Sequence, residues 1–310
     1  MQLNKSENEA QPSSFLIKQT KLGDETLDQI NGFWFLPEHV SGVKRVLNEF
    51  EPRQDDVILA SLPKTCTTWL KSLVYSIVNR SSLGSLEHSP HDLVPFLELQ
   101  VYKEKESPKR LENNNAQFGN GRRIFGTHIP YQMLGTTLET SDCRVVYVTR
   151  NPKDTLNWMW HFENEQKKDE EEAWPLEEAV GNFCKGIFPF GPYYEHVLGY
   201  KNASLKNRGK VLFITYEELA KDTETHVKRL AEFLGCGFGG EENEKVAEIV
   251  KSCSFEVLSN HVMNKSEDPC SDSRQATSGD YKNYLNPQAI GRVNSLTREK
   301  FHTYGFMYGI

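Results

Sequence analysis

The sequence predicts an α/β fold in which helices cover both faces of a parallel β-sheet. Four apolar, β-rich runs carry this prediction, and they span residues 56–63, 122–130, 143–150 and 210–219. None of them alternates strictly between apolar and polar residues, which is typical of strands buried on both faces. Three are followed by helical patterns, and strands that alternate with helices indicate parallel pairing. The 310 residues allow one large domain or two small ones.

The first half of the chain can be assigned in order. Residues 1–30 are polar and are expected to be frayed. The aromatic cluster GFWFLP follows at 32–37, before the strand at 56–63 and the helical pattern WLKSLVYSIVNR. The stretch 88–115 has the composition of a loop with short helical pieces, and it leads into the strand at 122–130.

The second half continues the same alternation. The strand at 143–150 precedes the helical pattern TLNWMWHF, and the strand at 210–219 precedes THVKRLAEFLG. The charge run at 167–174 indicates a solvated loop or helix end. Residues 262–290 are polar and rich in Ser, Asp and Asn, and a loop of that length in an α/β domain is often functional.

Charge and cysteine content exclude several classes of protein. The net charge of −7 argues against a nucleic-acid binder, so an anionic ligand would need a local basic pocket. The six cysteines form neither a CxxC pair nor a zinc-binding spacing, so we expect reduced thiols and no metal. There is no signal-like apolar stretch at the N-terminus and no run of about 18 apolar residues. We therefore expect a cytoplasmic protein without a membrane span.

The stretch 61-SLPKTCTTWLKSL-73 has the chemistry of an anion cradle. It reads as a strand, a turn and a helix, and the first amides of a helix lack internal partners and attract anions. Lys64 adds a full charge, and Thr65, Thr67 and Thr68 add hydroxyl donors. Cys66 stands where a glycine would make a tight turn easier. The spacing is not that of GxxxxGK[ST], and a plain helix cap is the alternative interpretation.

The line VILASLPKTCTTWLKSL resembles the 5′-phosphosulfate loop of the cytosolic sulfotransferases. GFWF and HDLVPFLE resemble the plant branch of that family. THIPY, YVTRNPKDT, FGPYYEHVLGY, TYEEL and SGDYKNYL follow in the family's order, so the resemblance spans nearly the whole chain. It implies one α/β sulfotransferase domain at 31–310, related to the P-loop nucleotide kinases, behind a flexible segment at 1–30.

The resemblance implies transfer of a sulfuryl group from 3′-phosphoadenylyl sulfate (PAPS) to a hydroxyl, without a metal. Lys64 would contact the phosphosulfate and stabilise the leaving group. Thr65, Cys66, Thr67 and Thr68 would supply amides and hydroxyls. Trp69 would stack on the adenine, and its alternative role is that of a core aromatic at the start of a helix.

His128 is the implied catalytic base. It ends a strand, at the carboxyl edge where open α/β sheets bind ligands, and histidine titrates near neutral pH. A core or capping histidine is the alternative among the nine histidines. Gly126 occupies the position where many animal members have a lysine, so one cation is missing there. His161 also matches a family position, and we expect a structural role for it.

The rest of the nucleotide site is implied by later motifs. Arg150 would bind the 3′-phosphate, with Asp154 as a helix cap after it. Trp158 departs from the family, which has a serine at this position. Further implied adenine contacts are Tyr216, Cys253 and Phe255, where a buried packing role is the alternative for the last two. In the late loop the family's Arg-Lys-Gly becomes Arg274, Gln275 and Ala276, and this loop is expected to close over the nucleotide.

Four aromatic residues are the implied acceptor pocket: Phe33, Trp34, Phe96 and Phe162. They favour a flat hydrophobic alcohol or phenol such as a flavonol or steroid, and ordinary core packing is the alternative. The motif through which animal members dimerise is absent from Lys282 onward, so a monomer is expected. A nucleoside kinase is a weaker alternative. A sulfotransferase-like protein that binds a nucleotide or hydrophobic ligand without turnover is another, motivated by Trp158, Gln275 and Ala276.

Overall fold

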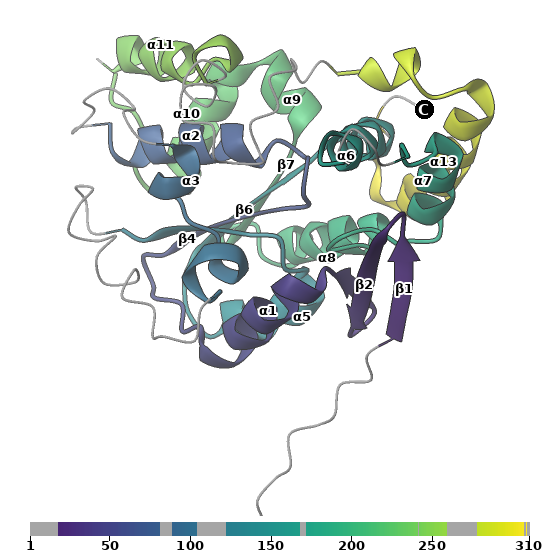
Figure 1. The fold of residues 1–310 in the computed structure, drawn as a ribbon. Coiled ribbons are helices and arrows are strands. Elements are labelled where there is room, and N and C mark those ends of the chain that lie inside the picture. The colour runs from purple at the N-terminus through teal and green to yellow at the C-terminus, as the bar shows by residue number, and fades with distance from the viewer. Residues whose placement is uncertain are drawn as a thin grey trace, which may run out of the picture.

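A computed structural model describes residues 18–80, 89–103, 122–167, 172–240, 242–258, 278–306 and 308. At its centre lies a sheet of four parallel strands in the order β5-β4-β6-β7 (Figure 1). The strands are β4 (Val57–Ser61), β5 (Ile124–Thr127), β6 (Arg144–Thr149) and β7 (Val211–Thr215). Each lies within one of the four apolar runs, so the prediction of a parallel α/β sheet is confirmed.

The fourth predicted strand is shorter than expected. The run 210–219 was assigned wholly to a strand, but β7 ends at Thr215 and helix α9 (Tyr216–Lys221) begins directly after it. Thr215 and Glu218 form a reciprocal capping box, in which each side chain accepts from the backbone amide of the other. That cap starts a helix at once, and a search for apolar runs does not detect it.

Helices cover both faces of the sheet. Figure 1 shows α2, α10 and α11 on one face and α1, α5 and α8 on the other. Alternate strand residues divide between these two cores: Leu59 packs toward α2, and Ile58 toward the opposite side. The helices named here are α1 (Pro37–Glu49), α2 (Thr67–Val78), α5 (Tyr131–Glu139), α8 (Tyr193–Lys206), α10 (Thr223–Phe233) and α11 (Asn243–Ser252).

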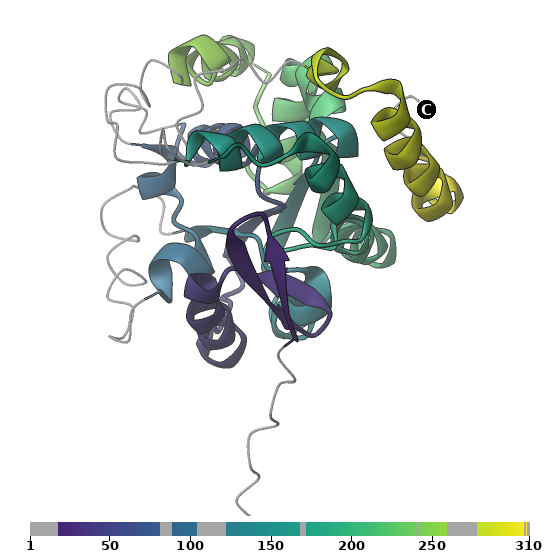
Figure 2. The same cartoon turned by 45° about the vertical axis from the view of Figure 1, so that its right-hand side comes forward.

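A third group of helices packs beside the sheet. It contains α6 (Pro152–Glu165), α7 (Leu176–Cys184) and α13 (Pro287–Phe301), which contact one another. Figure 2 shows α13 at the outer edge of the molecule. The short elements are α3 (Pro90–Leu93), the π-helix η1 (Leu97–Val101), and the 3₁₀ turns η2 (Asp280–Asn283) and η3 (His302–Tyr304). Among the described residues, no helix is long and apolar enough to cross a membrane.

The N-terminal segment differs from the prediction. Residues 1–30 were expected to be frayed, but an antiparallel sheet forms from β1 (Lys18–Leu22), β2 (Glu25–Ile30) and β3 (Phe33–Phe35). Leu22, Leu27 and Ile30 are buried in the core that also holds α1. These three side chains secure an otherwise polar hairpin, which explains why its composition suggested disorder. Residues 1–17 lie outside the described residues.

The predicted loops are described only in part. The stretch 88–115 contains α3 and η1, which agrees with the expected short helical pieces, and residues 104–121 are outside the described part. In the charge run 167–174, residues 168–171 are also outside the described part of the chain. Within 262–290, the described residues begin at 278 with η2 and the start of α13.

Candidate active site

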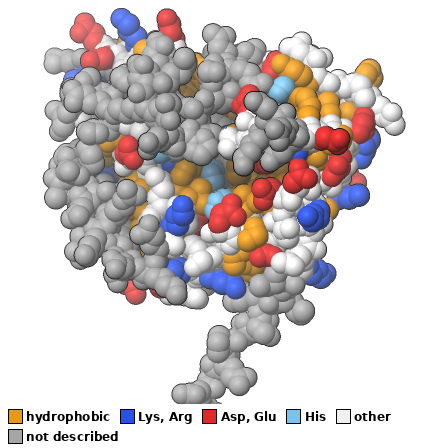
Figure 3. All heavy atoms as spheres, viewed as in Figure 1, with side chains coloured by type: hydrophobic (Ala, Val, Ile, Leu, Met, Phe, Trp, Pro, Cys, Tyr) orange, Lys and Arg blue, Asp and Glu red, His pale blue; other side chains and the backbone are white. Residues whose placement is uncertain are grey.

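The carboxyl ends of the four parallel strands bring the predicted residues to one edge of the sheet. His128 directly follows β5, Arg150 follows β6, and Tyr216 follows β7. Lys64 lies in the turn between β4 and α2. Because the strands are parallel and in register, these segments meet at one edge, where open α/β sheets bind ligands. The face seen in Figure 3 shows histidine among hydrophobic side chains near its centre.

The turn after β4 has the backbone of an anion-binding loop. Lys64 and Cys66 adopt left-handed conformations, with φ of 65° and 82°. Such turns point successive amides toward one concave side, and a non-glycine residue pays about 1–3 kcal/mol for the conformation. The first bond within α2 runs from the Leu70 amide to the Cys66 carbonyl at 3.2 Å, so the amides of residues 67–69 precede it. An anion at the front of α2 would therefore meet several N–H donors.

The threonine hydroxyls of this loop are mostly engaged inside the protein. Thr65 Oγ1 donates to a main-chain carbonyl three residues earlier at 2.7 Å, and Thr67 Oγ1 shares a 2.6 Å bond with Ser61 Oγ. The Thr68 hydroxyl lies 3.1 Å from Nε2 of His91. His91 is not among the residues predicted from the sequence. The Thr65 hydroxyl proton is therefore already donated within the protein, which leaves the Thr65 amide as the predicted donor to an anion. Burial raises the pKa of the Cys66 thiol to about 12, so it remains protonated.

Three hydrogen bonds hold His128. Its Nδ1 lies 2.7 Å from the Ser61 carbonyl, its amide donates to Glu98 Oε1 at 2.6 Å, and its carbonyl lies 3.0 Å from His196 Nε2. A carbonyl can only accept, so the His128 proton sits on Nδ1 and Nε2 is the basic nitrogen. Burial lowers the pKa of His128 well below its ordinary value, which keeps the ring neutral as a base requires.

A second layer supports His128 from segments far apart in the sequence. Glu98, in the π-helix η1, also accepts from Thr127 Oγ1 at 2.9 Å, and burial raises its pKa to about 7. His196 receives a 2.9 Å bond at Nδ1 from the Tyr147 hydroxyl, because its Nε2 proton is given to the His128 carbonyl. Glu98 and His196 are not among the residues predicted from the sequence. The one available signal for Glu98 is a carboxylate within an apolar stretch, VPFLELQV.

Two of the four predicted acceptor residues lie beside the reactive groups. The Phe96 ring centroid is 4.5 Å from that of His128, and the Lys64 ammonium lies 3.2 Å from the centroid of Phe162. Phe190, which was not predicted, lies 5.2 Å from the His128 ring. These aromatic rings give the site an apolar wall around a basic nitrogen and a cation.

The other two predicted acceptor residues, Phe33 and Trp34, lie in β3. Phe33 is buried in the core, and Trp34 is half-buried against it. The Trp34 backbone accepts from the Phe190 amide at 2.6 Å and donates to the Gly191 carbonyl at 2.9 Å. In the described structure Phe33 packs in the core and Trp34 holds the turn that carries Phe190, which agrees with the core-packing alternative.

The predicted nucleotide residues also gather together. The Arg150 guanidinium lies 4.8 Å from the Tyr216 ring and 5.5 Å from Trp158, and the Trp69 ring lies 5.9 Å from Tyr216. Arg150 is buried, and the 7% exposed Trp158 fills the space beside it. An arginine flanked by aromatic faces suits a phosphate next to a stacked base.

The remaining predicted contacts have different surroundings. Cys253 is buried behind α2, with Sγ 3.4 Å from Ser76 Oγ, and this agrees with its packing alternative. Phe255 is half-buried near the described end of that segment. Arg274, Gln275 and Ala276 lie outside the described residues.

Asp154 does not cap α6 as expected. The cap is Asn151, whose side chain accepts from the Lys153 amide at 3.0 Å. Asp154 instead accepts from the amides of Gly279 and Tyr281, at 2.9 and 3.2 Å, and so ties η2 to α6. The carboxylate in the first turn of the helix is used for a tertiary contact, because Asn151 already provides the cap. The expected structural role of His161 is consistent with its ring packing 4.3 Å from Tyr284.

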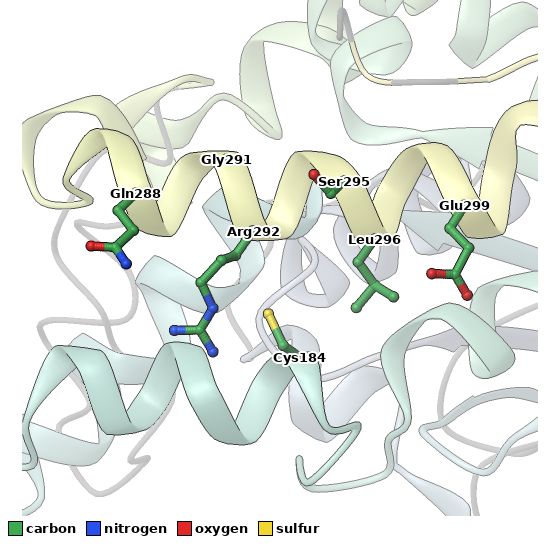
Figure 4. A pocket seen from close by; sticks show the side chains of 7 residues that line it. All are labelled: Cys184, Gln288, Gly291, Arg292, Ser295, Leu296 and Glu299. Atoms are coloured by element: carbon green, nitrogen blue, oxygen red, sulfur yellow. The ribbon is translucent and has the colours of Figure 1, made fainter.

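A separate groove lies between α7 and α13 (Figure 4). Cys184, Arg292, Ser295, Leu296 and Glu299 line it, and burial raises the pKa of the Cys184 thiol. The Cys184 thiol is therefore not activated as a nucleophile. Within the described ranges, no three His, Cys, Asp or Glu side chains are arranged to hold a metal ion.

Comparison with known proteins shows that a chain with this fold and sheet edge is a group-transfer enzyme. Residues 54–305 match the sulfotransferase domain family. Cytosolic sulfotransferase 16 of Arabidopsis thaliana is 38% identical over 92% of this chain and 87% of its own. Flavonol 4′-sulfotransferase of Flaveria chlorifolia is also 38% identical, over 92% of this chain and 91% of its own. The chain belongs to the sulfotransferase family and is a sulfotransferase.

Solved structures agree with this assignment. A crystal structure of an Arabidopsis thaliana sulphotransferase superposes with a TM-score of 0.73 and 35% identity, covering 94% of this chain and 92% of its own. A mouse sulfotransferase complexed with PAP superposes with a TM-score of 0.71 and 26% identity. The superposition covers 89% of this chain and 94% of the mouse chain. The sulfotransferase fold predicted from the sequence is confirmed, and an enzyme is favoured over a binder without turnover.

Proposed function

We propose that this enzyme transfers a sulfuryl group from PAPS to a hydroxyl of a small, flat, hydrophobic metabolite, with His128 as the general base. One observation carries the proposal: the His128 proton is fixed on Nδ1 by the Ser61 carbonyl, which leaves Nε2 basic at the edge of the sheet. That nitrogen shares the edge with the Lys64 loop, so a base and an anion cradle meet in one site. PAP bound to the related mouse enzyme supports PAPS as the donor.

Different residues of the site would bind different parts of PAPS. The amides at the front of α2 and the Lys64 ammonium would hold the phosphosulfate and neutralise charge on its leaving oxygen. Arg150 would bind the 3′-phosphate, and Trp69 and Tyr216 would flank the adenine. His128 Nε2 would take the acceptor proton as the new S–O bond forms. The donor's negative charge favours the imidazolium, so binding the donor would raise the basicity of a ring that burial depresses.

The acceptor class follows from the wall around His128. Phe96, Phe162 and Phe190 surround this end of the site with apolar rings, and these favour a phenol or hydrophobic alcohol over a sugar. A relative is named for its action on a flavonol, so flavonols are the first compounds to test. We also propose a cytoplasmic monomer: the relatives are named cytosolic, and the chain lacks the animal dimerisation motif.

The test combines labelled PAPS with a panel of flavonols, steroids and simple phenols. Wild-type enzyme should label at least one of them. His128→Ala should transfer at least about 100-fold more slowly, because general-base catalysis contributes roughly that much. Its affinity for PAP, measured by calorimetry, should stay within about threefold of wild type. A wild-type rate in the variant would reject His128 as the base, and millimolar PAP binding by the wild-type enzyme would reject PAPS as the donor.

A further inference from the structure

Lys71 is a buried cation beside the proposed reaction centre, and the proposed transfer by His128 and Lys64 does not use it. It lies in the second turn of α2, the helix that begins three residues after Lys64. Its side chain is 0% exposed, whereas lysines are almost never fully buried. The ammonium lies 3.2 Å from the centroid of Phe96 and 3.2 Å from His91 Nδ1. Because Phe96 packs on His128, the Lys71 ammonium borders the acceptor end of the site.

Gly126 makes room for this cation. A Cβ at position 126 would lie 2.8 Å from Lys71 Cε and 2.9 Å from the Phe96 ring, closer than real contacts allow. The lysine stem therefore passes over β5 at the one residue without a side chain, two positions before His128. Glycine is otherwise unfavourable inside a strand, so its presence here is explained by this close approach.

We propose that Lys71 is the second cation of the sulfuryl-transfer site, acting from the acceptor side while Lys64 acts from the donor side. The inference rests on the proposed function. His91, whose Nδ1 is 3.2 Å from Lys71, is affected by both: burial lowers the pKa of its ring to about 3, and the Lys71 and Lys64 charges add to that effect. Two cations on either side of one sulfuryl group would stabilise the negative charge on its oxygens throughout the transfer.

Lys71 also fixes the orientation of the donor loop. A lysine ammonium only donates, so His91 Nδ1 must accept and the His91 proton must sit on Nε2. That proton is then donated to Thr68 Oγ1 at 3.1 Å. The Thr68 hydroxyl consequently accepts from His91 and directs its own proton elsewhere, and an anion at the front of α2 is in position to receive it. Lys71, His91 and Thr68 thus form a relay from the acceptor side to the donor loop.

The transfer balances without a proton from Lys71. The acceptor hydroxyl gives its proton to His128 Nε2, and its oxygen forms a bond to sulfur. The bond between sulfur and the phosphate oxygen breaks, and its electron pair remains on the phosphate as PAP leaves. Lys71 stays protonated throughout and contributes charge and position only.

The test is the variant Lys71→Met, which keeps the length of the side chain and removes its charge. We expect a fall in kcat of about 100-fold, the size seen when one stabilising donor is removed. PAP affinity should weaken less than about tenfold. Lys228→Met, on the exposed face of α10, is the matched control and should behave as wild type. A kcat within about threefold of wild type in Lys71→Met would overturn the proposal.

Two further readouts separate this role from simple packing. The variant Lys71→Arg keeps a cation on α2 and should recover at least about tenfold of the kcat lost in Lys71→Met. It also keeps the test valid if Lys71→Met fails to fold, and a folded Lys71→Arg variant as inactive as His128→Ala would contradict the proposal. The acid limb of the pH profile of kcat/KM should move upward in Lys71→Met, because Lys71 lowers the pKa of His128.

Other charges that face His128 stay constant in this comparison: His39 from α1, Glu98 from η1 and His196 from α8. An acid limb that does not move in Lys71→Met would count against the role assigned to Lys71.

The experiments distinguish failure of the proposed function from failure of the Lys71 proposal. If the wild-type enzyme transfers sulfuryl groups and His128→Ala does not, the proposed function stands and the Lys71 variants decide this inference alone. A wild-type enzyme that transfers nothing from PAPS overturns both.

Discussion

At the scale of single residues, the tautomers of the buried histidines are fixed by partners that can only donate or only accept a hydrogen bond. A carbonyl that can only accept fixes the proton of His128 on Nδ1, and the same argument fixes that of His196 on Nε2. An ammonium that can only donate fixes the proton of His91 on Nε2. Three buried, neutral histidines therefore have defined tautomers before any ligand binds, and one basic nitrogen, His128 Nε2, is left for chemistry.

Glu98 should matter for turnover although it is a positioning residue. Its carboxylate accepts from the His128 amide at 2.6 Å and from Thr127 Oγ1 at 2.9 Å. Glu98→Ala leaves both buried donors without that partner, so the loop that carries His128 should shift. We expect kcat to fall by about 10–100-fold, the range for a displaced catalytic group, with KM for PAPS within about threefold of wild type.

Glu98→Gln is the matched variant. Its amide oxygen can still accept from the His128 amide, so kcat should recover to within about fivefold of wild type. Steady-state kinetics with saturating acceptor would separate kcat from KM for both variants. Equal loss in the alanine and glutamine variants, or a loss expressed only in KM for PAPS, would contradict the positioning role.

The residues found from sequence and those missed differ in one physical respect. His128 and Arg150 directly follow strands and Lys64 lies three residues after one, so the topology alone predicts that they converge. Lys71 and Glu98 reach the site through packing between segments that the sequence does not show to be adjacent. A lysine within an amphipathic helix is ordinarily taken as exposed, and nothing local indicates that Gly126 leaves room for it.

At the scale of elements, the position of Glu98 depends on a close contact between α1 and η1. Gly42 of α1 faces η1, and a Cβ there would lie 2.0 Å from the Glu98 carbonyl oxygen. The two helical segments therefore touch through backbone at this point. The buried hairpin β1-β2 packs on the same core, and it was missed because only a few apolar side chains secure it.

Gly42→Ala should destabilise the fold, because the added methyl group must push η1 away from α1. We expect the free energy of unfolding to fall by about 1–3 kcal/mol, the usual cost of overpacking. Gly291→Ala is the matched control, since Gly291 is also inside a helix but a Cβ there meets nothing within 4 Å. It should gain about 0.5–1 kcal/mol from helix propensity. Urea denaturation of both variants measures this, and a neutral or stabilising Gly42→Ala would refute the close contact.

At the scale of the whole molecule, an acidic chain holds cations and neutral histidines inside. The net charge is −7, yet Lys71 and Arg150 are buried at the sheet edge with His91, His128 and His196 close by. The site is thus a local basic region in a negative protein, as expected if it captures a small anion rather than a nucleic acid. Keeping these histidines uncharged links the stability of the whole fold to pH.

The free energy of unfolding should fall as the pH drops from 7 to 5.5. Burial lowers the pKa of His91 to about 3 and of His196 to about 4, and that of His128 falls well below its usual value. In the unfolded chain these rings take up protons near pH 6.5, so acid favours unfolding across this window. Glu98 opposes the effect, because its pKa of about 7 lets the folded state bind one proton. In this pH window the unfolded state takes up three histidine protons and the folded state takes up one proton on Glu98. For these four groups the free energy of unfolding is therefore predicted to fall by about 2 kcal/mol.

Urea denaturation at both pH values measures this loss directly. Glu98→Gln supplies the control, because it removes the proton bound by Glu98 while keeping the hydrogen-bond acceptor. Its loss between pH 7 and 5.5 should rise to about 4 kcal/mol. The histidines remain neutral in the folded state of both proteins, so the difference of about 2 kcal/mol reports on Glu98 alone. A stability that is constant or increases on acidification would mean that the histidines are charged in the folded protein, and His128 could not then serve as the base.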